Sequence, residues 1–149
     1  MSEKAFTNEL ERALARPDIE EVKRILSVYR KWQIADRSSE YLDEYAAVMD
    51  SPRDDPELAI SFVILAAATY DDPKFVGLMA AGVLEDLLQA PSENILRRLL
   101  DEARKTARIR WMLSIVYLHA IPSSDVRSAI EGAIGDMTGD DPIPPKPWA

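Results

Sequence analysis

DDPELAISFVILAAATYDDP, residues 54–73, carries the strongest structural signal in this chain: an apolar run enclosed by two Asp-Asp-Pro triplets. An aspartate can cap a helix, and a proline at the first helical position loses no hydrogen bond. The apolar run, residues 58–70, is too short to span a bilayer. We therefore predict a buried central helix that begins at Pro56 and a further helix that begins at Pro73.

The other prolines divide the chain at intervals of about one helix and a turn. Pro17, Pro91 and Pro122, like Pro56 and Pro73, lie at or near the start of an apolar stripe of helical period. No segment shows the sustained alternation of a strand. The sequence therefore predicts an all-α fold, a single-domain stack or bundle of about seven to nine short antiparallel helices over residues 1–135. Residues 136–149 should form an extended, proline-rich tail.

Capping residues predict where individual helices begin and end. The first helix should span about residues 3–16, and Asp18 with Glu21 should form a capping box for the second. The other expected boundaries are a cap at Ser38 or Ser39, a third helix through Met49, a loop over residues 50–55, a cap at Ser92, a bend near residues 105–106 and a cap within residues 122–125.

The composition is that of an acidic, soluble globular protein. The 149 residues include 18 Lys and Arg, 26 Asp and Glu, and no cysteine, for a formal net charge of −8. An acidic surface repels nucleic acid and anionic membrane, so neither is an expected partner. Without cysteine there are no disulfides and no thiolate groups. No targeting segment is visible, and the expected location is the cytoplasm.

The sequence contains no pattern typical of a catalytic, metal or cofactor site. His119 is the single histidine, whereas metal sites built from histidine normally use two or more. No serine near it lies in the Gly-x-Ser-x-Gly turn of a hydrolase nucleophile, and no glycines cluster as a phosphate-binding loop. We expect no catalytic residue, no metal and no cofactor, and a structural role for His119 near a helix C-terminus.

Adjacent carboxylates recur along the chain, and two pairs have an explanation in capping. Asp54-Asp55 and Asp71-Asp72 each precede a proline that begins a helix, where aspartate is favoured as a cap and as a partner of the helix dipole. Glu85-Asp86 lies inside a helical pattern, three residues after Gly82, where we expect a break or kink. This pair either lies on a solvated face or lines a groove.

One segment of the chain is basic. Residues 97–110 hold six basic and two acidic side chains, a local charge of +4, which within a net charge of −8 leaves −12 for the other residues. Arg97, Arg104 and Arg108 could share one helix face and bind an anion or a partner. The favoured interpretation is that the segment pairs with acidic helices of the same domain.

The tail, GDMTGDDPIPPKPWA from Gly135, should run extended in polyproline II geometry. Residues 142–145 and 144–147 match the P-x-x-P pattern of SH3-domain ligands, which is common by chance. The alternatives are a tail docked on its own domain, with Trp148 as the anchor, and a disordered end.

Residues 75–134 resemble an uncharacterised family of small bacterial helical proteins. The resemblance rests on AAGVLEDLL (residues 80–88), ILRRLLDEARKTARIRWML (residues 95–113) and the closing helix. It implies an all-helical fold and assigns no catalytic residue. More loosely, the proline-separated helices look like HEAT-type stacks, which present extended faces to partner proteins.

These features favour a non-enzymatic protein-binding module. Small acidic helical proteins look like bacterial immunity proteins, which sequester a toxin domain, often a basic nuclease, and an acidic surface would steer such a partner. The expected contacts are Glu40, Asp43, Glu44, Asp54, Asp55, Glu57, Glu85 and Asp86. The alternatives are a small enzyme or ligand-binding bundle, in which Glu85, Asp86 and His119 converge on a pocket, and a homo-oligomeric structural protein.

Overall fold

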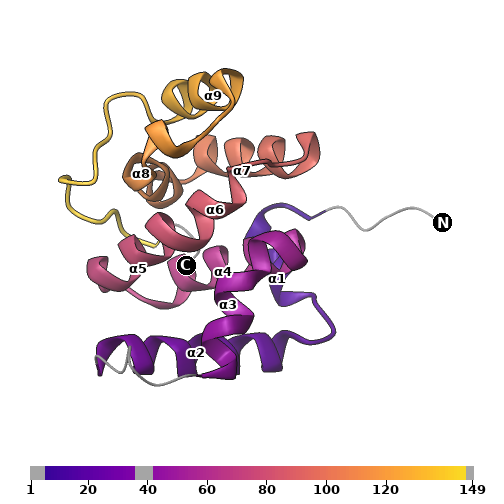
Figure 1. Cartoon of the computed structure of the whole chain (residues 1–149). Coiled ribbons are helices and arrows are strands. Elements are labelled where there is room, and N and C mark those ends of the chain that lie inside the picture. Colours follow the sequence, from indigo (N-terminus) through magenta and orange to yellow (C-terminus); the bar gives the residue numbers. More distant parts are fainter. Residues whose placement is uncertain (1–5, 36–41, 147–149) are drawn as a thin grey trace.

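The structure of the protein is a computed structural model that describes residues 6–35 and 42–146. This part of the chain contains helices and no strand, so the predicted all-α fold is confirmed (Figure 1). In chain order the elements are α1 (Glu9–Leu14), α2 (Ile19–Ile34), α3 (Asp43–Asp54), α4 (Pro56–Thr69), α5 (Pro73–Met79), the π-helical segment η1 (Ala80–Leu84), α6 (Glu85–Leu87), α7 (Glu93–Lys105), α8 (Ala107–Ile115), the 3₁₀ turn η2 (Leu118–Ala120) and α9 (Ser124–Ile134).

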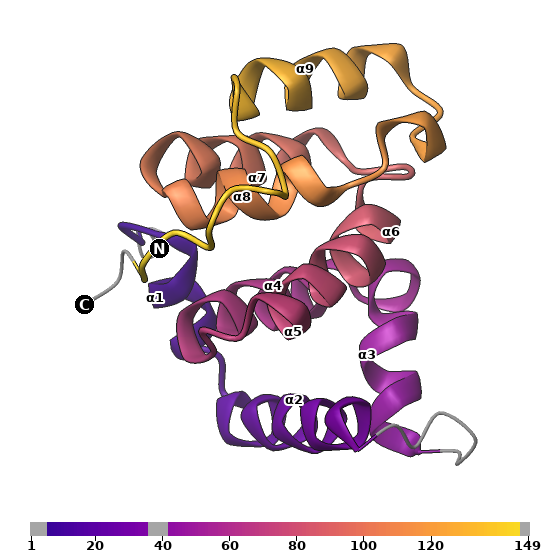
Figure 2. The same ribbon diagram turned by 90° about the vertical axis from the view of Figure 1, so that its left-hand side faces the viewer.

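The helices form a stack (Figure 2). At one end α2 and α3 pack together, α1, α4 and α5 occupy the middle, and α7, α8 and then α9 follow at the other end. The predicted central helix is α4, in which every residue from Ala59 to Ala67 is buried. Helices α1, α2, α3 and α5 all pack against it. Its near-uniform apolar character is therefore required, because it has no solvated face over this length.

The helix starts marked by proline and serine are confirmed. Pro56 and Pro73 occupy the first turns of α4 and α5, and the side chains of Asp55 and Asp72 accept hydrogen bonds from the backbone N–H groups at the start of these helices. Ser92 caps α7 and Ser123 caps α9 in the same way. The expected bend after Lys105 is also present, as the boundary between α7 and α8.

Two of the predicted boundaries near the N-terminus are wrong. Helix α1 begins at Glu9, with Asn8 as its cap, several residues later than predicted. Asp18 precedes α2 but makes no capping hydrogen bond, because its carboxylate accepts two hydrogen bonds from Arg16. The predicted cap at residue 38 or 39 lies outside the described residues.

The loop predicted over residues 50–55 is instead the last turn of α3, which continues through Pro52 to Asp54. Proline lacks the N–H that would bond to the carbonyl of Val48, four residues earlier. The buried Ser51 hydroxyl donates to that carbonyl at 2.7 Å and replaces the missing bond. A serine before the proline therefore lets the helix continue.

Of the break or kink predicted near Gly82, the break is absent, because the chain remains helical from Pro73 to Leu87. Gly82 lies within η1, five residues of π-helix inserted between α5 and α6. Such π-helical turns are a recognised cause of kinks in helices. A β-carbon at Gly82 would lie 3.7 Å from Met49 Cε, an ordinary contact, so packing alone does not require glycine there.

Candidate functional site

An acidic hollow lies where α3 ends and α4 begins. Asp43, Asp50 and Asp54 line it from α3, and Asp55 lines it from the cap of α4. The spacing of seven and four residues along α3 places the first three on one helix face. Ala46, Ala47, Ser51 and Leu58 complete a hollow of about 320 Å³. We call these eight residues the acidic hollow.

The hollow is negatively charged and open to solvent. Its four aspartates are exposed, and Arg53 lies beside two of them, with side-chain nitrogens 3.6 Å from Asp50 and 3.1 Å from Asp54. Hydrogen bonding to Asp54, with the nearby charges, raises the pKa of Arg53. With four carboxylates and one guanidinium group, the hollow has an excess of negative charge. Alanine and leucine side chains form the apolar part of its lining.

The structure brings together three of the predicted contact residues, Asp43, Asp54 and Asp55, and adds Asp50, which the sequence reasoning missed. Its place on the α3 face appears only when the helix extends beyond Met49. Glu44 instead lies 3.7 Å from Arg24, and Glu57 pairs with Arg98. Glu40 lies outside the described residues.

Glu85, Asp86 and His119 do not form a shared pocket. Glu85 Oε1 accepts a hydrogen bond of 2.7 Å from the backbone N–H of Tyr117, which precedes η2. Asp86 and His119 are exposed, and the His119 ring instead lies beside that of Tyr117, with the two ring planes tilted at 54°. Partial desolvation of the Asp86 carboxyl, and to a lesser extent the charge of Glu85, raises its pKa. The enzyme alternative, which required these side chains to converge, therefore loses its proposed site.

The favoured interpretation of the basic segment, pairing within the domain, is confirmed at Arg98. The residue is 8% exposed, and its side chain donates two hydrogen bonds to the buried Glu9 and one to Glu57. Burial alone lowers the pKa of Arg98, but the hydrogen bonds that it donates to both carboxylates outweigh this effect and raise the pKa. The buried Glu102 accepts a hydrogen bond from the backbone N–H of Glu9. These contacts join α1, α4 and α7.

The helical spacing of the buried residues in α7 could have predicted this network. The buried residues of the helix are Ile95, Arg98, Leu99, Glu102 and Ala103, which repeat at intervals of three and four. Arg98 and Glu102 thus lie on the apolar stripe itself, where a charged side chain requires a partner. The neighbouring Arg97, out of this phase, is exposed.

Protonation of Glu57 should lower the stability of the fold in acid. A Glu57→Gln variant should lack this contribution to the pH dependence of stability. The hydrogen bond from Arg98 lowers the pKa of Glu57 below its usual value. A carboxyl with a depressed folded-state pKa stabilises the fold above its unfolded-state pKa of about 4.3, and the contribution disappears as the pH falls through the folded value. Urea midpoints between pH 3 and 7 test this: wild type and variant should differ at neutral pH and converge in acid. A constant difference would contradict it.

Arg108 has a different role from the one considered in the sequence. It lies on α8, beyond the end of α7, so it does not share a face with Arg97 and Arg104. The residue is 1% exposed, and its side chain donates to the carbonyls of Ala67 and Tyr70 at the end of α4, and of Pro144 in the tail. A fourth hydrogen bond, of 2.9 Å, reaches the exposed Asp71. Arg108 therefore satisfies carbonyl groups that the end of α4 leaves without helical partners.

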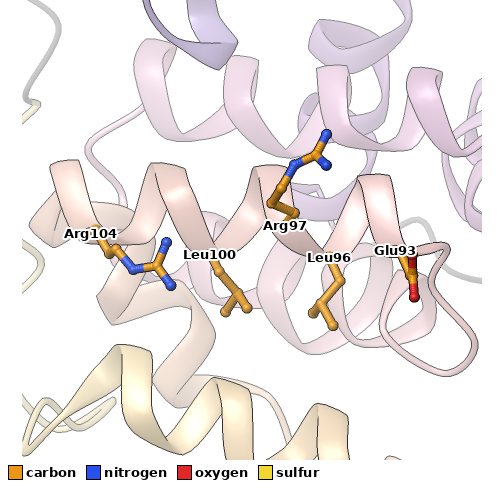
Figure 3. A pocket seen from close by; sticks show the side chains of 5 residues that line it. All are labelled: Glu93, Leu96, Arg97, Leu100 and Arg104. Carbon is orange, nitrogen blue, oxygen red and sulfur yellow. The ribbon is translucent and has the colours of Figure 1, made fainter.

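Arg97 and Arg104 remain on the outer face of α7 (Figure 3). With Leu96, Leu100 and Glu93 they line a shallow hollow of about 240 Å³. Figure 3 shows the two leucines side by side along the helix, with Arg104 beyond Leu100 and Glu93 beyond Leu96. Arg97 donates to Asn94 and Arg104 to Asp101, so local partners on α7 hold both guanidinium groups.

Two further classes of site have no support in the described residues. Within residues 6–35 and 42–146, no three acidic or histidine side chains are grouped so as to hold a metal ion. In the same part of the chain, no helix combines the length and apolar character needed to cross a bilayer.

One protein-family model matches this chain, over residues 33–137, and its description is "Family of unknown function (DUF6869)". The match includes α3, which carries most of the acidic hollow, and ends shortly after α9. Comparisons with curated proteins and with solved structures gave no match.

Proposed function

Because the model match covers most of its length, the protein belongs to this family of unknown function, and we propose that it is a non-enzymatic module that binds a basic protein through the acidic hollow. The observation that carries the proposal is the gathering of Asp43, Asp50, Asp54 and Asp55 around one concave, partly apolar surface. A concave surface of one charge concentrates the field and favours encounter with a partner of opposite charge.

The distribution of positive charge supports this proposal. Arg98 and Arg108 are buried in contacts within the domain, and Arg110 donates to backbone carbonyls of α7. The charges of Arg98 and Arg108 thus lie inside the domain, whereas the aspartates of the hollow are exposed. A basic partner would meet an acidic face with few competing cations. Complementary charges of this kind mainly increase association rate and selectivity.

In its most specific form, the proposal is an immunity protein that neutralises a basic toxin domain. The cationic surface of such a domain would insert lysine or arginine side chains between the aspartates. Their alkyl stems would cover Ala46, Ala47 and Leu58, and their charged ends would pair with the carboxylates. Binding should therefore be tight at low salt and weaken as salt screens the exposed charges.

A charge-neutralising triple variant, Asp43→Asn with Asp50→Asn and Asp54→Asn, should weaken partner binding at least about tenfold. Asp55 is left unchanged because it caps α4. The tagged chain is first purified from its native host to identify a stoichiometric partner, and the affinity of the purified pair is then measured at several salt concentrations. The wild-type affinity should depend steeply on salt, and that of the variant much less.

A matched control separates the hollow from net charge. Glu20→Gln with Asp125→Asn and Glu131→Gln removes three exposed carboxylates on α2 and α9, none of which lines the hollow. This control should retain nearly wild-type affinity. Equal losses in the two triple variants would refute the hollow as the binding surface, and a native host that yields no stoichiometric basic partner would refute the proposed function.

A further inference from the structure

The tail returns from α9 across α8 and is held there by two hydrogen bonds (Figure 2). The indole N–H of Trp111 donates to the carbonyl of Asp141 at 2.9 Å. One turn earlier on α8, Arg108 Nε donates to the carbonyl of Pro144 at 2.7 Å. Both donors are almost fully buried, and both bind main-chain carbonyls. The tail therefore runs antiparallel to α8, with successive helical turns facing successive parts of the tail.

Apolar contacts between α8 and the tail follow the same antiparallel pairing as the two hydrogen bonds. Gly139 lies against Ile115, one turn beyond Trp111, so closely that a β-carbon at Gly139 would lie 2.9 Å from Ile115 Cγ1. Ile143, between the two bonded carbonyls, packs against the hydrophobic core. We call Arg108, Trp111 and Ile115 the α8 strip, and residues 138–146 the strap. Each of the three residues of the α8 strip contacts a different part of the strap, so the strap is held along its length and not at a single point.

The chemistry of the α8 strip suits proline-containing segments. Prolines have no N–H, and three of residues 142–146 are prolines. The strip supplies donors only, so it needs no N–H from its ligand. Asp141 and Pro144 are three residues apart, which is one turn of polyproline II helix, and carbonyls at this spacing point to the same side. The donors thus recognise a repeat that an extended proline-rich segment presents naturally.

We propose that the α8 strip is a binding site for extended proline-containing peptides of the type Asp-Pro-Ile-Pro-Pro-Lys, and that the strap occupies it as a built-in ligand. The family match, residues 33–137, includes the whole strip and stops before the strap. When the strap is docked the site is closed, and when the strap is released the site accepts a free peptide of the same chemistry.

The test uses the full-length chain with one change in the strap, Ile143→Asp, which removes the apolar anchor and undocks the strap. The probe is a fluorescein-labelled synthetic peptide of residues 138–149, followed by fluorescence anisotropy. The Ile143→Asp chain should bind the probe saturably. Wild type should bind at least about tenfold more weakly, because its own strap competes at an effective concentration in the millimolar range. A probe that carries Asp at position 143 should not bind.

Trp111→Phe, added to Ile143→Asp, keeps an aromatic ring and removes the indole donor. It should weaken peptide binding about tenfold, the effect of one lost hydrogen bond in a buried site. The matched control is Trp32→Phe in the same background, because the buried indole nitrogen of Trp32 has no hydrogen-bond partner. This control should leave peptide binding unchanged. Equal binding by the two tryptophan variants, or equal binding of both probes, would overturn the proposal.

A second measurement covers the case in which Ile143→Asp fails to fold. The chain has no cysteine, so Lys146→Cys provides a single labelling position in an otherwise unchanged strap. Excess unlabelled peptide at millimolar concentration should increase the mobility of a spin label at this position. A dimer that forms by exchange of straps between two copies, and that the peptide dissociates, would also support the site. A label that stays immobile at every peptide concentration would overturn it.

Discussion

Arg108→Met should lower the free energy of unfolding by about 3–5 kcal/mol, the range for removing one member of a buried charged network. The methionine keeps much of the apolar stem but none of the donors. The buried carbonyl of Ala67 and the partly buried carbonyls of Tyr70 and Pro144 would then lose these hydrogen bonds, and a buried group left without a partner costs about 1–3 kcal/mol. For a chain of this length the melting temperature should fall by roughly 10 °C or more.

Urea denaturation and amide hydrogen exchange measure this effect. Exchange should accelerate in the strap as well as at the end of α4, because Arg108 contacts both. Asp71→Asn is the control: it removes the exposed carboxylate partner but none of the carbonyl contacts, so stability should change little. If Asp71→Asn were as damaging as Arg108→Met, the ion pair and not the carbonyl contacts would hold this region together.

Arg98→Met should cost a similar amount, about 3–5 kcal/mol, for a different reason. It leaves the carboxylate of Glu9 in a buried position, 7% exposed, where the remaining cation is Arg12 at 3.7 Å. An uncompensated buried charge is more costly than the lost contacts themselves. The packing of α1 on α7 should weaken first, since the hydrogen bonds between Arg98 and Glu9 join these helices.

The double variant Arg98→Met with Glu9→Leu distinguishes the two contributions. With neither charge present, stability should recover to well above that of Arg98→Met alone, because apolar replacement of a buried pair is often close to neutral. The coupling energy from the double-mutant cycle, measured by urea denaturation, should reach at least about 1 kcal/mol. Additive effects would show that Arg98 stabilises the fold through packing and not through its charge. Arg97→Met, on the exposed side of α7, is the matched control and should be nearly neutral.

The parts of the fold that could be predicted from sequence depend on interactions within a few residues. Asp55 with Pro56, and Asp72 with Pro73, contain their capping chemistry locally, so their helix starts follow directly. The failure at Pro52 is instructive, because the compensating hydroxyl of Ser51 is also local. A proline ends a helix only where no neighbouring side chain supplies the donor that the proline lacks.

The site was harder to predict because its geometry depends on distant residues. Glu9 and Arg98 are 89 positions apart, and no periodicity connects them. The acidic hollow could be predicted as a surface but not as a concavity, since its shape requires the last turn of α3 and the cap of α4 to meet. Glu57 and Glu85 illustrate the same difficulty: both are acidic and near the surface, yet both are engaged within the domain.

The two buried arginines also constrain how the protein is made on the ribosome. Arg98 is paired with a residue synthesised long before it, but Arg108 completes its contacts only when Pro144 has left the exit tunnel. A nascent chain that contains α8 but not the strap therefore holds a guanidinium group with part of its binding partners missing. The final folded state is available only after translation has passed residue 144, so the last step of folding must follow synthesis of the strap rather than accompany that of the helices.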